Sequence, residues 1–212
     1  MRNIIHWFLG KPKMSQAKVL NDREIRKCLL YIASKRHAAR NRALFLFTHL
    51  TGARCCEVAA LRISHVLTRD GEIRDEVRLT SAETKGNRSR TIVLSQRIRE
   101  ELRTYLRERF GVRDLLPITL TDLDRALFPT QKNPDRGFTA NTLCQKFFEI
   151  YHGAGIEGAS SHSGRRGFIT NLAQRGIGVR VLQELANHKS LSVTQRYIDV
   201  NPAMLRQAVE VL

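Results

Sequence analysis

The chain has 212 residues, of which 42% are hydrophobic, and this is enough to bury the core of one domain. Lysine and arginine number 36 against 20 acidic residues, so the formal net charge at pH 7 is +16. Such an excess repels itself, and a polyanionic partner is its expected reason, with nucleic acid first and an anionic membrane surface second. No stretch approaches the roughly 20 apolar residues of a membrane span, so no membrane-spanning helix is expected.

Cysteine usage indicates a reducing compartment. The four cysteines contain no Cys-x-x-Cys pair, and a disulfide between the two adjacent ones is unfavourable. The N-terminal apolar run 4–9 is too short for a secretory signal. We therefore expect a cytoplasmic protein with no metal site and with four reduced thiols, at Cys28, Cys55, Cys56 and Cys144.

The N-terminal half is predicted to hold three helices followed by a hairpin. Asn21 is a helix cap, and the apolar residues after it recur every three or four positions through Ile32. Thr51 and Gly52 end a second helix, which carries a continuous apolar run. In chain order we expect a basic arm over 1–20, helices from 22, over 38–50 and from 54, strands over 77–82 and 91–94, and a turn at 85–87.

The C-terminal half is predicted to be helical with one long loop. Ser95 caps a helix, and Thr139 opens another whose apolar face includes Phe148. An Asn-Pro pair at 201–202 starts a final amphipathic helix. The sequence thus predicts a mainly α domain over 21–212 with a small antiparallel β-sheet (α+β), its later elements being a loop over 111–135, short helices over 164–174, 179–186 and 190–197, and a C-terminal helix over 202–212.

Six residues suited to phosphate chemistry stand in an ordered series. Arginine stays protonated and offers a planar fork to phosphate oxygens, while histidine donates hydrogen bonds or moves protons near neutral pH. A flexible lysine in a turn can protonate a leaving oxygen, and tyrosine can be a nucleophile when cations help its hydroxyl to ionise. Each alone is more often a surface or core residue, so the inference depends on order and spacing. The series is Arg54 in Thr51-Gly52-Ala53-Arg54-Cys55-Cys56-Glu57, Lys85 in the turn, His162 and Arg165 in Ser161-His162-Ser163-Gly164-Arg165, His188 in Ala186-Asn187-His188, and Tyr197.

This series resembles the active site of the tyrosine recombinase (integrase) family, and the likeness extends over about residues 20–212. The resemblance implies the catalytic-domain fold of that family. It also implies that Arg54 and Arg165 bind the scissile phosphate and that His162 and His188 assist them. Glu57 matches the acidic residue after the first arginine and would hold the cations of the site in place.

The resemblance also implies a reaction, the cutting and rejoining of DNA strands. Tyr197 would form a 3′-phosphotyrosine bond, and Lys85 would be the general acid that protonates the departing 5′-oxygen. The covalent bond conserves the energy of the broken one, so neither a metal nor another cofactor is expected. The expected partners are double-stranded DNA and further copies of the chain in a synaptic tetramer. The C-terminal helix could join those copies, and the sequence supports equally its packing on its own domain.

The chain departs from the family at several positions near these residues. Gly164 and Arg166 stand where the family commonly has Leu and His, and His65 stands where it often has Asp. Ala186-Asn187 replaces the usual Leu-Gly before His188. The chain also lacks room for the separate helical DNA-binding domain of most members, so it is either a fragment or a short member of the family.

Two other functions remain open from sequence. A type IB topoisomerase shares the arginine, lysine and tyrosine chemistry, but the paired histidines and the spacing of His188 to Tyr197 favour a recombinase. A catalytically inactive DNA-binding protein would read DNA through the segment 179–197, but retention of all six groups argues against it. The sequence discloses neither the DNA site nor whether the outcome is integration, excision or inversion.

Overall fold

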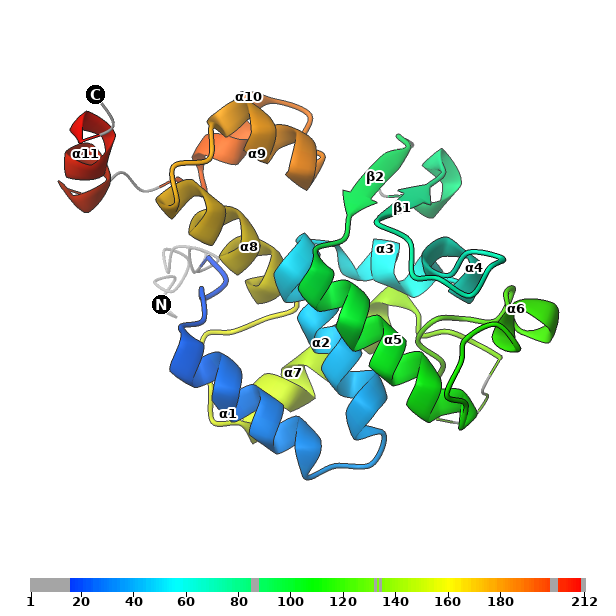
Figure 1. Ribbon diagram of the computed structural model, residues 1–212. Coiled ribbons are helices and arrows are strands. Elements are labelled where there is room, and N and C mark those ends of the chain that lie inside the picture. Colours follow the sequence, from blue (N-terminus) through cyan, green and yellow to red (C-terminus); the bar gives the residue numbers. More distant parts are fainter. Residues whose placement is uncertain (1–15, 85–87, 132, 134, 199–201, 211–212) are drawn as a thin grey trace, which may run out of the picture.

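The computed structural model describes residues 16–84, 88–131, 133, 135–198 and 202–210, and Figure 1 shows helices surrounding a central one, with a small sheet at one side. The predicted class, mainly α with one small antiparallel sheet, is confirmed. The elements are α1 Asp22–Ala33, α2 Ala38–Thr51, α3 Cys55–Ala60, α4 Ile63–Val66, β1 Glu76–Leu79, the 3₁₀ turn η1 Ser81–Glu83, β2 Arg90–Val93, α5 Gln96–Phe110, α6 Ile118–Thr121, α7 Ala140–Gly153, α8 Ser163–Gln174, α9 Val179–Ala186, α10 Leu191–Gln195 and α11 Pro202–Val209.

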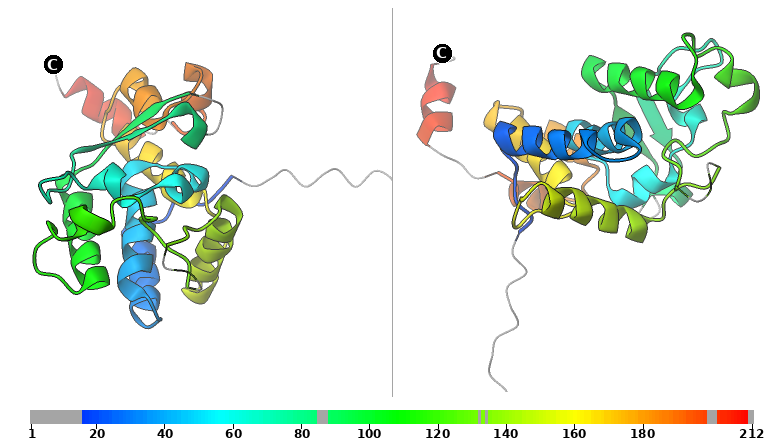
Figure 2. Two further views of the ribbon diagram at one scale, coloured as in Figure 1. Left: turned by 90° about the vertical axis from the view of Figure 1, so that its right-hand side faces the viewer. Right: turned by 90° about the horizontal axis from the view of Figure 1, so that it is seen from below.

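Helix α2 is the centre of the core. Its run Leu44 to Phe47 is fully buried, and α1, α5 and α8 all pack against it. A helical segment that is apolar on all sides, like this run, has no solvent-facing side, so it has to be surrounded by other elements. Figures 1 and 2 show α2 between these helices, and its C-terminal end, where Thr51 and Gly52 lie, therefore points into the interior.

Helix α1 begins where the sequence predicts. The Asn21 side chain accepts a hydrogen bond from Glu24 N at 2.9 Å, and the Glu24 carboxylate accepts one from Asn21 N at 3.1 Å. This reciprocal pair satisfies two amides of the first turn, which otherwise lack partners. The preceding segment 16–20 is irregular, and Leu20 is buried in the core, while the earlier part of the predicted arm lies outside the described residues.

The two strands form an antiparallel pair with Val77 opposite Ile92 and Leu79 opposite Arg90. The expected first strand, 77–82, is too long, because β1 ends at Leu79 and a 3₁₀ turn follows. There the Glu83 carboxylate accepts a hydrogen bond from Thr80 N at 2.8 Å, so a side chain rather than a second strand satisfies that amide. The turn predicted at 85–87 lies outside the described residues.

The apolar face of α7 also differs from its prediction. Leu143, Phe147 and Tyr151 are buried as expected, but Phe148 is exposed and stacks on His152 with ring centroids 5.6 Å apart. Adjacent helical positions lie about 100° apart, so Phe148 falls outside the buried stripe that Phe147 and Tyr151 share. The expected loop 111–135 contains the short helix α6.

The C-terminal elements α8, α9 and α10 lie together beside the sheet, and α11 lies apart from them in Figure 1 and in the right-hand view of Figure 2. Leu205 and Val209 of α11 are exposed. Each of the four cysteines is a free thiol. Within the part of the chain that the structure describes, no helix is both long and apolar enough to cross a bilayer.

Candidate active site

The first arginine lies at the corner between α2 and α3. Gly52 ends α2 with a left-handed φ of 65°, and a Cβ there would lie 2.6 Å from the Phe168 ring. Glycine is therefore favoured at this position both by the backbone conformation and by the lack of space. Arg54 precedes α3, where its amide donates to Glu57 Oε2 at 2.7 Å and its Nη1 donates to Glu57 Oε1 at 2.8 Å. The carboxylate thus fixes both the backbone and the guanidinium of Arg54.

The second arginine, Arg165, lies in the first turn of α8 and is buried. Its Nη1 donates to Gly52 O at 2.8 Å and its Nη2 to Ala186 O at 2.5 Å. Gly164 makes this possible, because a Cβ there would stand 2.7 Å from Thr48 Oγ1 of α2. The departure from Leu at position 164 therefore accompanies a close approach of α8 to α2.

The histidine comes from the turn after α9, and the tyrosine follows the end of α10, Leu191–Gln195. Asn187 ends α9 with a left-handed φ of 48°, a conformation that asparagine tolerates best among residues with a side chain, so it replaces the usual glycine with little strain. His188 is buried, and its Nδ1 lies 2.9 Å from Thr194 Oγ1. The Tyr197 ring stacks on the His188 ring, with centroids 5.4 Å apart and 24° between the planes.

The site carries more positive than negative charge. Burial, and then repulsion by Arg54 and Arg90, lower the pKa of Arg165 to about 10, so its guanidinium still holds a proton at pH 7. Burial and the same cluster of arginines lower the pKa of His188 to about 4, so its imidazole is neutral at pH 7. A bound anion would raise both pKa values again, because it favours the protonated, positively charged forms.

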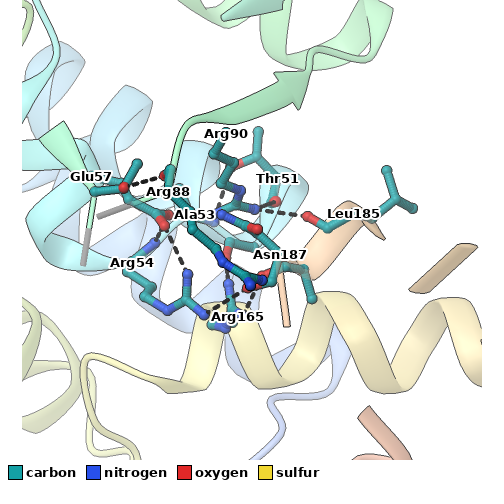
Figure 3. Close-up of polar contacts among 12 residues, drawn as sticks. Thr51, Ala53, Arg54, Glu57, Arg88, Arg90, Arg165, Leu185 and Asn187 are labelled. Atoms are coloured by element: carbon teal, nitrogen blue, oxygen red, sulfur yellow. Dashed lines mark hydrogen bonds and ion pairs between the residues drawn. The ribbon is translucent and has the colours of Figure 1, made fainter. Parts of the chain in front are cut away.

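Arg90, the first residue of β2, is a site residue that the sequence reasoning missed. Its buried guanidinium pairs with Glu57, and its Nη2 donates to Leu185 O at 2.8 Å (Figure 3). The predicted strand began one residue too late, at Thr91. A strand begun at 90 would have placed this arginine on the inward face with Ile92, and a charge at an inward position is the signal that could have found it.

The structure brings Arg54, Arg165, His188 and Tyr197 into one region, but it does not join all the predicted residues. Figure 3 shows Arg54, Arg90 and Arg165 converging from three separate elements. His162 immediately precedes α8, one turn before Arg165, and its side chain is exposed. Lys85 lies outside the described residues, so its place relative to the site stays a prediction.

A mainly helical domain that gathers two arginines, a histidine and a tyrosine from distant segments is the arrangement expected of the catalytic domain of a tyrosine recombinase. The chain belongs to the phage integrase family, whose model matches residues 18–204. It is 32% identical to tyrosine recombinase XerA of Pyrococcus furiosus over 95% of this chain and 65% of that protein. It is 29% identical to tyrosine recombinase XerD of Vibrio vulnificus over 79% of this chain and 51% of that protein.

Solved structures share the fold. The crystal structure of XerA recombinase matches with a TM-score of 0.66 and 20% identity, over 93% of this chain and 64% of that one. XerH recombinase bound to its difH substrate in a pre-cleavage complex matches with a TM-score of 0.65 and 23% identity, over 91% of this chain and 53% of that one. The chain thus spans between half and two thirds of the length of the relatives that it matches.

Proposed function

We propose that this chain is the catalytic domain of a site-specific DNA recombinase, which cleaves and rejoins strands through a 3′-phosphotyrosine intermediate in integration, excision or inversion. The observation that carries the proposal is the convergence of Arg54 and Arg165, from α3 and α8, beside a histidine that stacks on Tyr197. Two guanidinium groups held by backbone carbonyls form a preorganised site for a phosphate whose charge grows during the reaction.

In the proposed reaction the Tyr197 hydroxyl attacks the phosphorus and loses its proton, and the bond from phosphorus to the 5′-oxygen breaks. Arg54 and Arg165 stabilise the charge that develops on the nonbridging oxygens. The Lys85 ammonium gives a proton to the departing 5′-oxygen, and the free 5′-hydroxyl of another strand later reverses the step. Glu57 keeps Arg54 aimed at the phosphate, and His162 adds a donor from the start of α8.

His188 has a particular part in this scheme. At pH 7 its imidazole is neutral. The imidazole stacks against the ring of Tyr197, whose hydroxyl group must lose its proton in the proposed step. A neutral imidazole can accept a proton, whereas a permanently charged group cannot. A phosphate beside Arg54 and Arg165 would raise the pKa of His188, so proton uptake by His188 becomes easier once DNA is bound.

The proposed partners follow from charge and from α11. A net charge of +16 suits double-stranded DNA, whose binding should weaken steeply with salt because counterions are released. The exposed Leu205 and Val209 support the docking of α11 on a neighbouring copy in a synaptic tetramer on DNA. The relatives named above come from an archaeon and a bacterium, whose DNA lies in the cytoplasm, and we expect this protein to act there too.

The test is to trap the protein on a nicked duplex that lets the cleaved end diffuse away and to map the modified residue by mass spectrometry. We expect a covalent adduct at Tyr197, and Tyr197→Phe should bind DNA without forming it. Tyr197→Phe that still forms the adduct would refute the nucleophile assignment. Efficient relaxation of a supercoiled plasmid that lacks a recombination site would favour a type IB topoisomerase, and DNA binding without any adduct would favour an inactive DNA-binding protein.

A further inference from the structure

Three consecutive carbonyls at the C-terminal end of α9 each accept a hydrogen bond from a different arginine. The last carbonyls of a helix have no partner within it and carry partial negative charge, so cations complement them. His188 follows these residues directly, so whatever fixes this turn also fixes the ring that stacks on Tyr197. In order along the chain, Leu185 O accepts from Arg90 at 2.8 Å, Ala186 O from Arg165 at 2.5 Å and Asn187 O from Arg54 at 3.3 Å.

Arg90 differs from Arg54 and Arg165 because its side chain is buried where no substrate can contact it. Its side chain is 1% exposed, and its Nε is buried without a hydrogen-bond partner in the part of the chain that the structure describes. Its Nη1 pairs with Glu57, and its Nη2 lies 3.4 Å from Thr51 O as well as 2.8 Å from Leu185 O. One guanidinium therefore joins β2 to the ends of α2 and α9 and to Glu57 of α3.

Glu57 transmits this arrangement to Arg54. The carboxylate is fully buried, and its Oε2 accepts from both Arg90 and the Arg54 amide, which leaves Oε1 for the Arg54 guanidinium. A buried charge is costly to leave unpaired, so Arg90 restricts the orientations that Glu57 can take. The direction of the Arg54 guanidinium consequently depends on a residue that never meets the phosphate.

We propose that Arg90 is a positioning residue of the strand-cleavage reaction: it orients Glu57 toward Arg54 and holds the C-terminal turn of α9, which carries His188, against the phosphate-binding pair. This rests on the proposed function, and the role differs from general charge attraction because it depends on several directed hydrogen bonds. An ammonium can meet the Glu57 carboxylate, but it cannot reproduce the planar fork that also reaches Leu185 O.

The experiment compares Arg90→Lys and Arg90→Met with Arg78→Met in the full chain. Arg78 lies in β1 and is 81% exposed, so its variant removes a charge from the same sheet outside the site. Unfolding followed by circular dichroism shows whether each variant is folded at the assay temperature. Two readouts then follow: the affinity for inorganic phosphate, titrated at the His188 ring resonances by NMR, and the single-turnover rate of covalent joining to a nicked duplex.

We expect both Arg90 variants to lose about tenfold or more in phosphate affinity and in cleavage rate, by analogy with the loss when the partners that orient the ligands of a metal site are removed. DNA binding should fall much less than cleavage, and Arg78→Met should stay near the unmodified protein in both readouts. A dependence of phosphate affinity on Arg90 without any covalent adduct would support the positioning role while the proposed DNA reaction fails.

Four results would overturn the proposal. If Arg90→Lys keeps the phosphate affinity and the rate of covalent joining of the unmodified protein, the charge at this position alone matters. An equal loss in Arg78→Met would mean that the effect is general to the sheet. Unmodified protein that binds no phosphate would leave no anion site to arrange. Unfolding of both Arg90 variants at the assay temperature would make Arg90 a residue of the fold rather than of the reaction.

Discussion

Replacing Gly164 with alanine tests how the second arginine is placed. A Cβ at this position would stand 2.7 Å from Thr48 Oγ1, 3.0 Å from His49 Nδ1 and 3.1 Å from the Thr48 carbonyl carbon. The last of these is backbone of α2 and cannot rotate away, so α8 has to shift outward. Arg165 follows directly in the chain, and the shift would weaken its hydrogen bond to Gly52 O.

The magnitude can be isolated with a matched control in the same helix. At Gly167 a Cβ would meet only a Val19 methyl carbon at 4.0 Å, which is ordinary van der Waals contact. Alanine is favoured over glycine by about 1 kcal/mol in the interior of a helix, where Gly167 lies, and by no more than that in the first turn, where Gly164 lies, whereas overpacking costs about 1–3 kcal/mol at Gly164 alone. We therefore expect Gly167→Ala to stabilise the protein and Gly164→Ala to be less stable than Gly167→Ala by about 1–3 kcal/mol.

Urea unfolding followed by circular dichroism measures both free energies, provided that the slope with denaturant is unchanged. Covalent joining to a nicked duplex measures the functional part, and Gly164→Ala should be slower than Gly167→Ala at temperatures where both are folded. Equal stabilities and equal cleavage rates in the two variants would refute the claim that clearance at Gly164 sets the position of Arg165.

The remaining predictions concern charge and protonation. Burial lowers the pKa of His49 from its ordinary 6.5 to about 4, so the unfolded chain takes up a proton first as pH falls and stability is lost between about pH 6.5 and 4. His49→Phe should remove about 2 kcal/mol of the fall in unfolding free energy between pH 7 and pH 5, and an unchanged pH profile would contradict this. Lys85→Ala should slow cleavage while DNA binding stays near normal, and a binding loss as large as the rate loss would argue against a general acid. Arg165→Ala should cost at least about 2 kcal/mol of transition-state stabilisation in single-turnover cleavage, and a rate within twofold of the unmodified protein would exclude it from the phosphate site.

Local signals explain why much of the fold was predictable. The Asn21 cap, the apolar run of α2 and the stop at Gly52 act within a few residues, and each appears in the structure where it was expected. The errors also have local causes. The sequence between 80 and 82 favours a strand, but Glu83 turns back to satisfy the Thr80 amide, and this competition is decided by a side-chain hydrogen bond rather than by strand propensity.

The candidate site, like the fold, was predictable from the sequence only in part. Arg54, Arg165, His188 and Tyr197 were predicted from their order along the chain, and the structure brings them into one region; their roles stay a prediction. The clearance at Gly164 and the left-handed turn at Asn187 explain departures from the family that sequence alone left without a reason. The first depends on how closely α8 approaches α2, and the second depends on the backbone angle φ of Asn187.

The sequence by itself determined the helical periodicity, the Asn21 and Thr139 caps and the ordered set of candidate site side chains, since these depend on neighbours a few residues away or on identity alone. Only the tertiary structure decided that Arg90 lies behind that set and that three arginines share the end of α9. The physical reason is that a buried guanidinium is stabilised by carbonyls and a carboxylate from elements far apart in the chain, and those partners exist only once the helices and the sheet have packed.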